Sequence, residues 1–201
     1  MNHIYFGLMC EGPTDRAAIP HFVDKALCHL RAFDEVNTSF EWNIDEKAGK
    51  SSNAEVIDAV NNGYYDILLV HRDGANDPDN IYENLMGSFP NSVPIIPVRE
   101  LEAWMIVDHE AFLRATQTYV DDLSEIPANQ AETTHDPKKV FKTNIEKCLG
   151  KKPNPRDGEV EVWYSKIAEE VNFEIVQNVP WFNHFINDLR NGLTNLGWPF
   201  A

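Results

Sequence analysis

The sequence predicts an α/β fold with a mostly parallel central sheet flanked by helices and a helical C-terminal extension. Short apolar runs and helical patterns alternate four times up to about residue 116, and this order favours parallel strands with helices on both faces. After Tyr119 the strand signals stop, whereas helical patterns continue. The 201 residues suffice for one core. We therefore expect an α/β domain at 1–118 and a helical extension at 119–201 packed on it.

The first strand is expected at 4–10, an apolar run followed by Glu-Gly-Pro. Thr14 is the expected N-cap of the next helix, which keeps helical spacing although Pro20 stands inside it. Further strands are expected over three runs: 39–44, 66–70 and 93–98. Prolines in the last run place it toward a sheet edge. A loop is expected at 47–52, and helices over three stretches: 53–62, 79–89 and one that reaches about residue 116.

The extension is predicted to be helical and to supply aromatic core residues. Its expected helices are 138–149, 160–171 and 181–196, and its aromatic residues are Trp163, Phe173, Trp181, Phe182 and Phe185. The three cysteines, Cys10, Cys28 and Cys148, are widely spaced and odd in number, which favours buried free thiols over disulfides. No apolar run has the length of a membrane span, and no cleavable signal pattern is present. We therefore expect a cytoplasmic protein without membrane contact.

The charge is strongly negative but unevenly distributed. A net charge of −15 argues against a general nucleic-acid coat, because phosphates would be repelled. Between Asp136 and Arg156, however, seven basic residues stand against two acidic ones, so that this segment carries +5 and the rest of the chain −20. Two explanations remain open: a solvated helix face, or a surface on which a phosphate backbone lies beside an acidic site.

Carboxylates follow three of the predicted strands. Glu11 follows the first, Asp73 follows the run at 66–70, and Glu100 with Glu102 follow the run at 93–98. Ligands of open parallel sheets bind at the carboxyl ends of the strands. Hard divalent cations take oxygen ligands, and such ions serve phosphoryl transfer. Any one of these carboxylates would be explained as a helix cap or a solubilising group, but together they favour a Mg²⁺ or Mn²⁺ site.

Several ordered motifs resemble a known domain. EGPTD (11–15), LLVHRDGAND (68–77) and the acidic turn in PVRELEAW (97–104) together resemble the Toprim domain of topoisomerases, primases and OLD-type nucleases. The Glu-Gly-x-Thr-Asp spacing is similar to the OLD-type version. PVRELEAW, DPKK (136–139) and SKIAEEV with PWFNHFINDL (165–171, 180–189) further resemble an uncharacterised bacterial family of Toprim-like proteins of about this length. That resemblance covers nearly the whole chain and implies a Toprim-like fold.

The resemblance also implies roles for particular residues. Glu11 matches the family's first glutamate, a metal ligand or general acid/base, and Asp15 matches the second carboxylate of the motif. The paired aspartates of Toprim fall on residues 71–73, where Asp73 matches and His71 departs from the pattern. His71 could ligate a metal, although histidine favours softer ions than Mg²⁺. Equally, it could be a packed or hydrogen-bonded histidine, and the site could be inactive.

Further residues complete the expected site. Asp77 is the expected substitute for the missing aspartate. Arg72 could face a phosphate or pair with a neighbouring carboxylate. Glu100 is expected to face the site, with Glu102 as a second ligand or as a neighbour of one; if a helix has already begun there, the two diverge and only one serves. Trp104 is expected in the core rather than as a base-stacking platform.

A lysine is the last expected member of the site. OLD-type nucleases use a distant lysine that stabilises the transition state, and the DPKK turn offers Lys138 and Lys139 as phosphate-binding candidates. The expected helix start favours Lys139 as the catalytic one. A lysine there opposes the helix dipole, which hints at a reason other than stability. A solvated lysine is the alternative.

The resemblance implies a metal-dependent nuclease that hydrolyses nucleic-acid phosphodiester bonds in a setting such as phage defence. DNA and RNA both remain open as substrates, a partner protein is a further candidate, and the oligomeric state is open. The alternative is a non-catalytic Toprim-fold module that binds a partner protein, which the acidic surface and His71 favour. The sequence has no Gly-x-Ser-x-Gly elbow, complete Walker loop or dinucleotide fingerprint.

Overall fold

The computed structural model describes residues 4–30, 40–45, 65–75, 77–88, 92–154 and 157–197. Within them lies a sheet of parallel strands in the order β2-β1-β3-β4. The strands are β1 (Ile4–Met9), β2 (Phe40–Asp45), β3 (Ile67–His71) and β4 (Ser92–Ile95). The predicted α/β class, the parallel sheet and the edge position of the last strand are confirmed. The helix expected at 53–62 and the loop at 47–52 lie outside the described residues.

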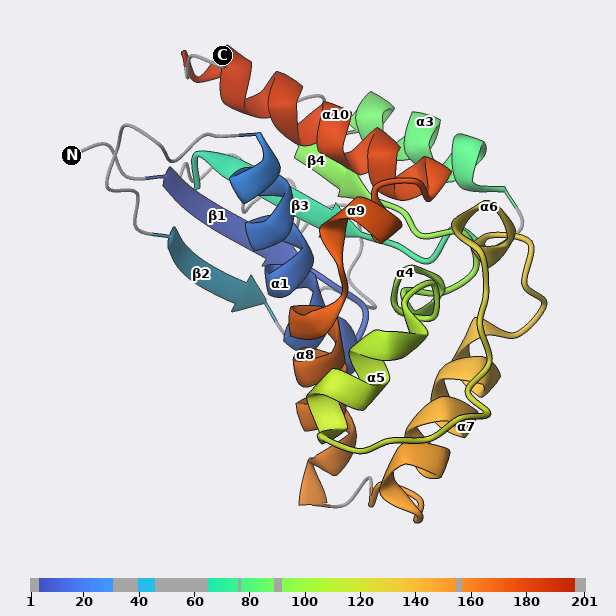
Figure 1. The fold of residues 1–201 in the computed structure, drawn as a ribbon. Helices are drawn as coiled ribbons and strands as arrows, with labels where there is room; N and C mark the ends of the chain where they lie inside the picture. The colour runs from blue at the N-terminus through green and yellow to red at the C-terminus, as the bar shows by residue number, and fades with distance from the viewer. Residues whose placement is uncertain are drawn as a thin grey trace.

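Helices occupy most of the remaining described chain. They are α1 (Pro13–His29), α3 (Pro78–Ser88), α4 (Glu102–Met105), α5 (His109–Thr116), α6 (Ala128–Ala131), α7 (Pro137–Leu149), α8 (Glu159–Glu170), α9 (Phe173–Val176) and α10 (Pro180–Asn195). Figure 1 shows that α4 and α7 lie on the side to which the strand arrows point, and that α10 runs along β4. The helices predicted in the extension are confirmed to within about a residue at each end.

The two faces of the sheet are buried by different helices. Leu68 and Val70 of β3 pack with Leu85 of α3 on one face. Ile67 and Leu69, which point the other way, belong to the main core with α1 and the C-terminal helices. That core combines residues from before and after position 118. The extension therefore shares the core of the α/β part instead of forming a core of its own.

Trp104 occupies the centre of this core. It is fully buried and makes edge contacts with Phe22 and Phe182 and a stacked contact with Phe185. Its predicted core position is thus confirmed. Aromatic pairs in these arrangements add to the free energy gained by burial alone. Because Trp104 directly follows the acidic turn at 99–102, its burial anchors that turn to the core.

Three local expectations were wrong. Gly12, not Thr14, is the N-cap of α1; its backbone is extended, Pro13 follows in the first turn, and the Asp15 side chain reaches back to the Gly12 N–H. The helix expected to reach Thr116 is broken between α4 and α5, since Asp108 starts a new helix as its N-cap. Cys28 is exposed, whereas Cys10 and Cys148 are buried free thiols as predicted.

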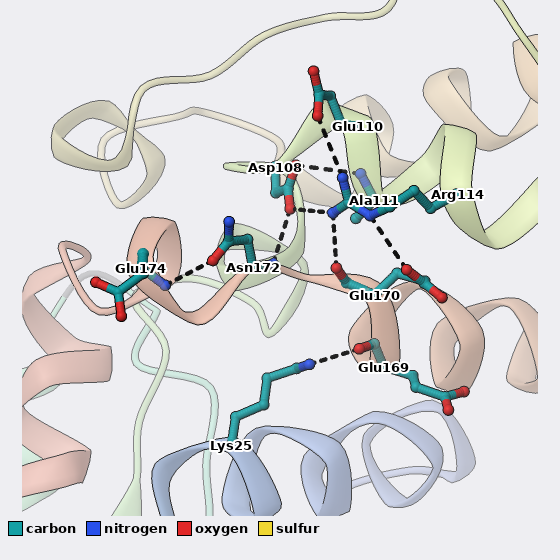
Figure 2. Close-up of polar contacts among 9 residues, drawn as sticks. All are labelled: Lys25, Asp108, Glu110, Ala111, Arg114, Glu169, Glu170, Asn172 and Glu174. Atoms are coloured by element: carbon teal, nitrogen blue, oxygen red, sulfur yellow. Dashed lines mark hydrogen bonds and ion pairs between the residues drawn. The ribbon is translucent and has the colours of Figure 1, made fainter. Parts of the chain in front are cut away.

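The same Asp108 fastens α5 to the end of α8 (Figure 2). Its nearly buried carboxylate accepts hydrogen bonds from the backbone of Ala111 at 3.2 Å and of Asn172 at 2.9 Å, and from Arg114 Nη2 at 2.7 Å. Arg114 also donates to the Glu170 carbonyl at 2.8 Å. One carboxylate therefore caps a helix, pairs with an arginine and holds the α8–α9 turn. Among the described helices, none is long and apolar enough to cross a membrane.

Candidate functional site

The candidate site lies where the strands end. Along the paired strands, Met9 of β1 is opposite Val70 of β3, and His71 is opposite Ile95 of β4. The residues that follow these positions therefore leave the sheet at one edge. They bring Glu11 from the β1–α1 connection and Asp15 from the first turn of α1 toward a common region with Asp73, which follows β3, and with Glu100 and Glu102 at the start of α4.

The segment after β3 is held against the chain that follows β4. The Arg72 N–H donates to the Ile95 carbonyl at 3.1 Å, and the Gly74 N–H donates to the Pro97 carbonyl at 2.8 Å. A Cβ atom at Gly74 would lie 2.9 Å from that Pro97 oxygen. Only glycine permits this approach. Asp73 is therefore fixed between two backbone hydrogen bonds.

His71 lies between two of the carboxylates. Its Nδ1 is 3.6 Å from Asp15 Oδ2, and its Nε2 is 3.6 Å from Asp73 Oδ1. The side chain has no exposed surface, and neither ring nitrogen has a hydrogen-bond partner among the described residues. Burial, and then the charge of Arg72, lower the pKa of His71 to about 3. The imidazole is therefore neutral, and these contacts are not ion pairs.

The two carboxylates beside His71 resist ionisation. Burial, followed by the charges of Glu11 and Asp15, raises the pKa of Asp73 from 3.8 to about 8. Burial, followed by the charge of Glu102, raises the pKa of Asp15 from 3.8 to about 6, against the hydrogen bond from Gly12. Among the described residues, only His71 lies within ion-pair distance of these two carboxylates. The more distant charge of Lys138 also acts on both, but it does not cancel the rise in their pKa values.

The outer carboxylates do have basic partners. Arg72 Nη1 lies 3.7 Å from Glu11 Oε1. Lys138 Nζ lies 3.5 Å from Glu100 Oε1 and 3.6 Å from Glu102 Oε1, and the Lys138 N–H donates to Glu100 Oε2 at 3.3 Å. Burial alone would lower the pKa of Lys138, but Glu102 and Glu100 outweigh it and raise that pKa. Lys138 is therefore a firmly charged bridge between the two glutamates.

Tyr164 is a member of the site that the sequence did not indicate. Its hydroxyl donates a hydrogen bond to Oε1 of Glu102, which is itself nearly buried. Burial, and then the charge of Glu102, raise the pKa of Tyr164, so the hydroxyl stays protonated. A tyrosine in a helix far along the chain carries no local pattern that would link it to Glu102. Its contact arises only because α8 packs against α1 and α5.

Residues 10–190 match the family model of DUF4276, a domain of unknown function. The chain belongs to the DUF4276 family. No curated protein and no solved structure gives a significant match. The matched range begins one residue before Glu11 and includes every residue of the candidate site. Because the family has no assigned function, the function of this DUF4276 protein has to be argued from the site itself.

Two of the residues predicted for the site are not brought into it. The Asp77 carboxylate accepts the Asn80 N–H at 3.3 Å, so it caps α3. The Lys139 side chain is exposed. The backbone N–H of Lys139 donates to the Asp136 side chain at 2.8 Å. Lys138 rather than Lys139 contacts the carboxylates. The helix begins at Glu102, yet Glu100 and Glu102 both reach Lys138 and do not diverge.

The donor set of the DUF4276 site fits a hard divalent cation. No three His, Cys, Asp or Glu side chains of the described residues stand together as a formed metal site. Nevertheless, Asp15 and Asp73 flank an imidazole whose buried nitrogens lack partners. Carboxylate oxygens are the ligands that Mg²⁺ and Mn²⁺ prefer. A cation at this position would offset the burial and the like charges that raise the pKa values of the two carboxyl groups.

Proposed function

We propose that this DUF4276 protein is a Mg²⁺- or Mn²⁺-dependent phosphodiesterase of Toprim-like fold that hydrolyses the backbone of nucleic acids. One observation carries the proposal: a partly buried carboxylate cluster at the end of a parallel sheet, whose two inner members have raised pKa values and, among the described residues, no lysine or arginine within ion-pair distance. Strongly perturbed ionisable groups in such a position are typical of functional sites.

The free-energy cost of this cluster argues for a cation. An aspartate whose pKa is raised by burial and like charges destabilises the folded state whenever it is ionised. A structural carboxylate would be expected to have a cap or a salt bridge, as Asp108 has. Among the described residues, Asp73 has no helix to cap and no lysine or arginine within ion-pair distance. A bound divalent ion would turn this unfavourable charge into a ligand set.

Each residue then has a distinct task. A bound divalent cation would supply charge neutralisation at the phosphate and an activated water. Glu11, Asp15 and Asp73 would hold the ion, and the neutral imidazole of His71 would donate its one N–H to one of the two aspartates. Lys138, charged and adjacent to Glu100, is better placed than Lys139 to stabilise negative charge on the phosphate. Arg72 would orient Glu11.

The Toprim-like assignment is part of the proposal. It is supported by the EGPTD and LLVHRDGAND motifs and by a parallel sheet in which carboxylates follow β1 and β3. His71 replaces an expected aspartate, so that one negative charge fewer faces the ion. Nucleic acid is the proposed substrate class, and phage defence is the proposed setting.

A second function, a Toprim-fold module that binds a partner protein, is favoured by one observation. The chain's own Arg72 and Lys138 already pair with Glu11, Glu100 and Glu102. Such pairs would stabilise a site that no longer holds an ion. In that case the protein would bind neither Mg²⁺ nor Mn²⁺ and would not cleave nucleic acid.

Metal binding and cleavage together test the proposal. Calorimetric titration with Mn²⁺ and Mg²⁺ is expected to show binding to the wild type and none to Asp73→Asn. DNA and RNA incubated with either ion are expected to be cleaved by the wild type and not by Glu11→Gln. If neither ion binds to the wild type, the metal-site proposal is refuted, whatever the outcome of the cleavage assay.

A further inference from the structure

We propose that a single-stranded nucleic acid binds in a hollow between α7 and α8, with one base beside Trp163 and its phosphates on Lys142 and Lys152. This inference rests on the proposed function, because it assigns the substrate strand to a groove that adjoins the carboxylate cluster. The hollow has a volume of about 340 Å³, which is within the range of roughly 300–1,000 Å³ typical of ligand sites.

The hollow has a mainly basic rim and an aromatic interior. Lys138 and Lys142 of α7 and Lys152 of the following loop contribute positive charge, against one acidic lining residue, Glu146. The walls are formed by Phe141, Tyr164 and the half-buried Trp163, together with smaller apolar residues. Grooves that bind single strands combine these two features: cations follow the phosphates, and aromatic rings stack with bases.

The lysines of the hollow differ from their neighbours in their partners. Lys147 pairs with Asp122 at 2.9 Å, and Lys151 pairs with Glu159 at 3.2 Å. Lys142 and Lys152, by contrast, are exposed and form no ion pair with any acidic residue that the structure describes. In a chain of net charge −15, unpaired lysines that line one groove indicate an anionic ligand.

Trp163 can take part in stacking because it is only partly buried. It borders the hollow, and Lys166 Nζ lies 4.8 Å from the centre of its ring. This cation adds positive charge next to the indole. Trp104, in contrast, is sealed in the core and is out of reach of a base.

The hollow is continuous with the carboxylate cluster. Lys138 lines the hollow and pairs with Glu100 and Glu102, and Tyr164 lines it and donates to Glu102. Thr14, which also lines the hollow, directly precedes Asp15. A strand that rests in the hollow would therefore lie next to the acidic site.

The shape of the hollow favours single strands over duplexes. The bases of a duplex are already stacked and paired, so they cannot reach Trp163 without being extruded. A duplex nevertheless carries the higher charge density. Binding by lysine charge alone would therefore favour the duplex, whereas binding by charge and stacking together favours the single strand.

The test measures binding without hydrolysis. Fluorescence anisotropy with short labelled oligodeoxyadenylate and oligoriboadenylate, each also annealed to its complement, is carried out on the full chain in EDTA. The single strands are expected to bind at least about tenfold more tightly than the duplexes. Comparing the affinities of the deoxyribose and ribose oligonucleotides shows whether the groove prefers DNA or RNA. Trp163→Leu is expected to weaken single-strand binding about tenfold, and quenching of tryptophan fluorescence by the oligonucleotide is expected to disappear in Trp163→Phe.

The lysines are tested by salt dependence with a matched control. Lys142→Gln and Lys152→Gln are each expected to reduce the slope of log K against log salt concentration by about 0.7, the value for one phosphate contact to a single strand. Lys151→Gln removes the same charge one residue away, outside the hollow, and is expected to leave the slope unchanged. These substitutions affect exposed side chains, so the result does not depend on whether the Trp163 variants fold.

Two results would overturn the assignment of this groove. One is equal or tighter binding of the duplex, with a slope that Lys142→Gln and Lys152→Gln leave unchanged. The other is that polyglutamate displaces the labelled oligonucleotide as well as unlabelled oligonucleotide does, which would indicate an acidic protein segment as the ligand. Metal titration is independent of this assay. If the ions bind but the groove variants have no effect, only the groove fails; if single strands bind but the ions do not, only the proposed metal function fails.

Discussion

Replacing Asp73 with asparagine should stabilise the metal-free protein while it removes a ligand of the proposed metal site. The Asp73 carboxyl has a pKa of about 8 because of burial and because of the neighbouring charges of Glu11 and Asp15. Asparagine has nearly the same shape but cannot ionise. The substitution therefore removes a repulsion that the folded state otherwise carries. Enzymes often have active-site residues that lower the stability of the fold but are needed for activity.

The sign and size of the effect follow from linkage. Because the folded-state pKa lies above the ordinary value of 3.8, the protonated carboxyl contributes stability that is fully present below pH 3.8 and is lost as the pH rises through about 8. The whole shift corresponds to about 6 kcal/mol. However, the side chain is 37% exposed, so solvent screening reduces this value, and we expect about 2 kcal/mol. For a chain of this length, that is about 4–8 °C in Tm.

Thermal unfolding at pH 6 and pH 9, in EDTA and in saturating Mn²⁺, measures both effects. In EDTA at pH 9, Asp73→Asn should unfold at a higher temperature than the wild type, and the difference should shrink at pH 6. In Mn²⁺ the wild type should gain about 2.7 kcal/mol at a concentration of 100 Kd, whereas the variant should gain nothing.

Asp77→Asn is the matched control for this prediction. It makes the same chemical change four residues later, at the N-cap of α3, where asparagine caps as well as aspartate. Its metal-free Tm and its response to Mn²⁺ should both equal those of the wild type. If Asp73→Asn unfolds at a lower temperature than the wild type in EDTA at pH 9, the unbalanced charge at this site does not exist, and the reasoning is refuted.

Three further predictions concern the supports of the site, each measured by urea unfolding. Gly74→Ala should lower the free energy of unfolding by about 1–3 kcal/mol, because the added Cβ would meet the Pro97 carbonyl. Gly87 has open space around it, so Gly87→Ala should leave that free energy unchanged or raise it by up to about 1 kcal/mol. Asp108→Ala should lower the free energy of unfolding by about 3 kcal/mol, because it removes a helix cap and a buried ionic hydrogen bond to Arg114. Glu110 pairs with the same arginine at the surface, and Glu110→Ala should lower the free energy of unfolding by less than about 0.5 kcal/mol. Tyr164→Phe should cost about 1–3 kcal/mol by removing the hydroxyl donor of a buried carboxylate, and a neutral result would contradict that contact.

Much of the sheet and its acidic edge could be predicted from the sequence, because the signals are local and the topology is restrictive. Ile67–His71 is an uninterrupted apolar strand, and the prolines near β4 correctly marked an edge. Once the strands are parallel, residues that follow them must leave at the same edge. The proximity of Glu11 to Arg72 and of Asp73 to His71 follows from this rule, whereas the approach of Asp15 to His71 also depends on the phase of α1.

The choice between neighbouring residues could not be predicted, since it depends on helix phase. Lys138 and Lys139 differ by about 100° around α7, and only the packing of that helix decides which one faces Glu100 and Glu102. Asp77 was expected in the cluster because it lies in the acidic segment after β3. The start of α3 is the competing demand, and the carboxylate caps that helix instead.

The role of His71 could be predicted only in part from the sequence. The sequence identifies it only as a departure from an acidic pattern and leaves its role open. The structure adds that the position is fully buried and lies 3.6 Å from two carboxylates that already resist ionisation. An aspartate there would place a third charge in the same buried space and would raise the cost of the metal-free fold further. A neutral imidazole fills the position without that charge and offers one donor and one acceptor nitrogen to the carboxylates beside it. The departure from the pattern therefore lowers the charge that a bound cation has to balance, and it leaves in place both aspartates that such a cation needs.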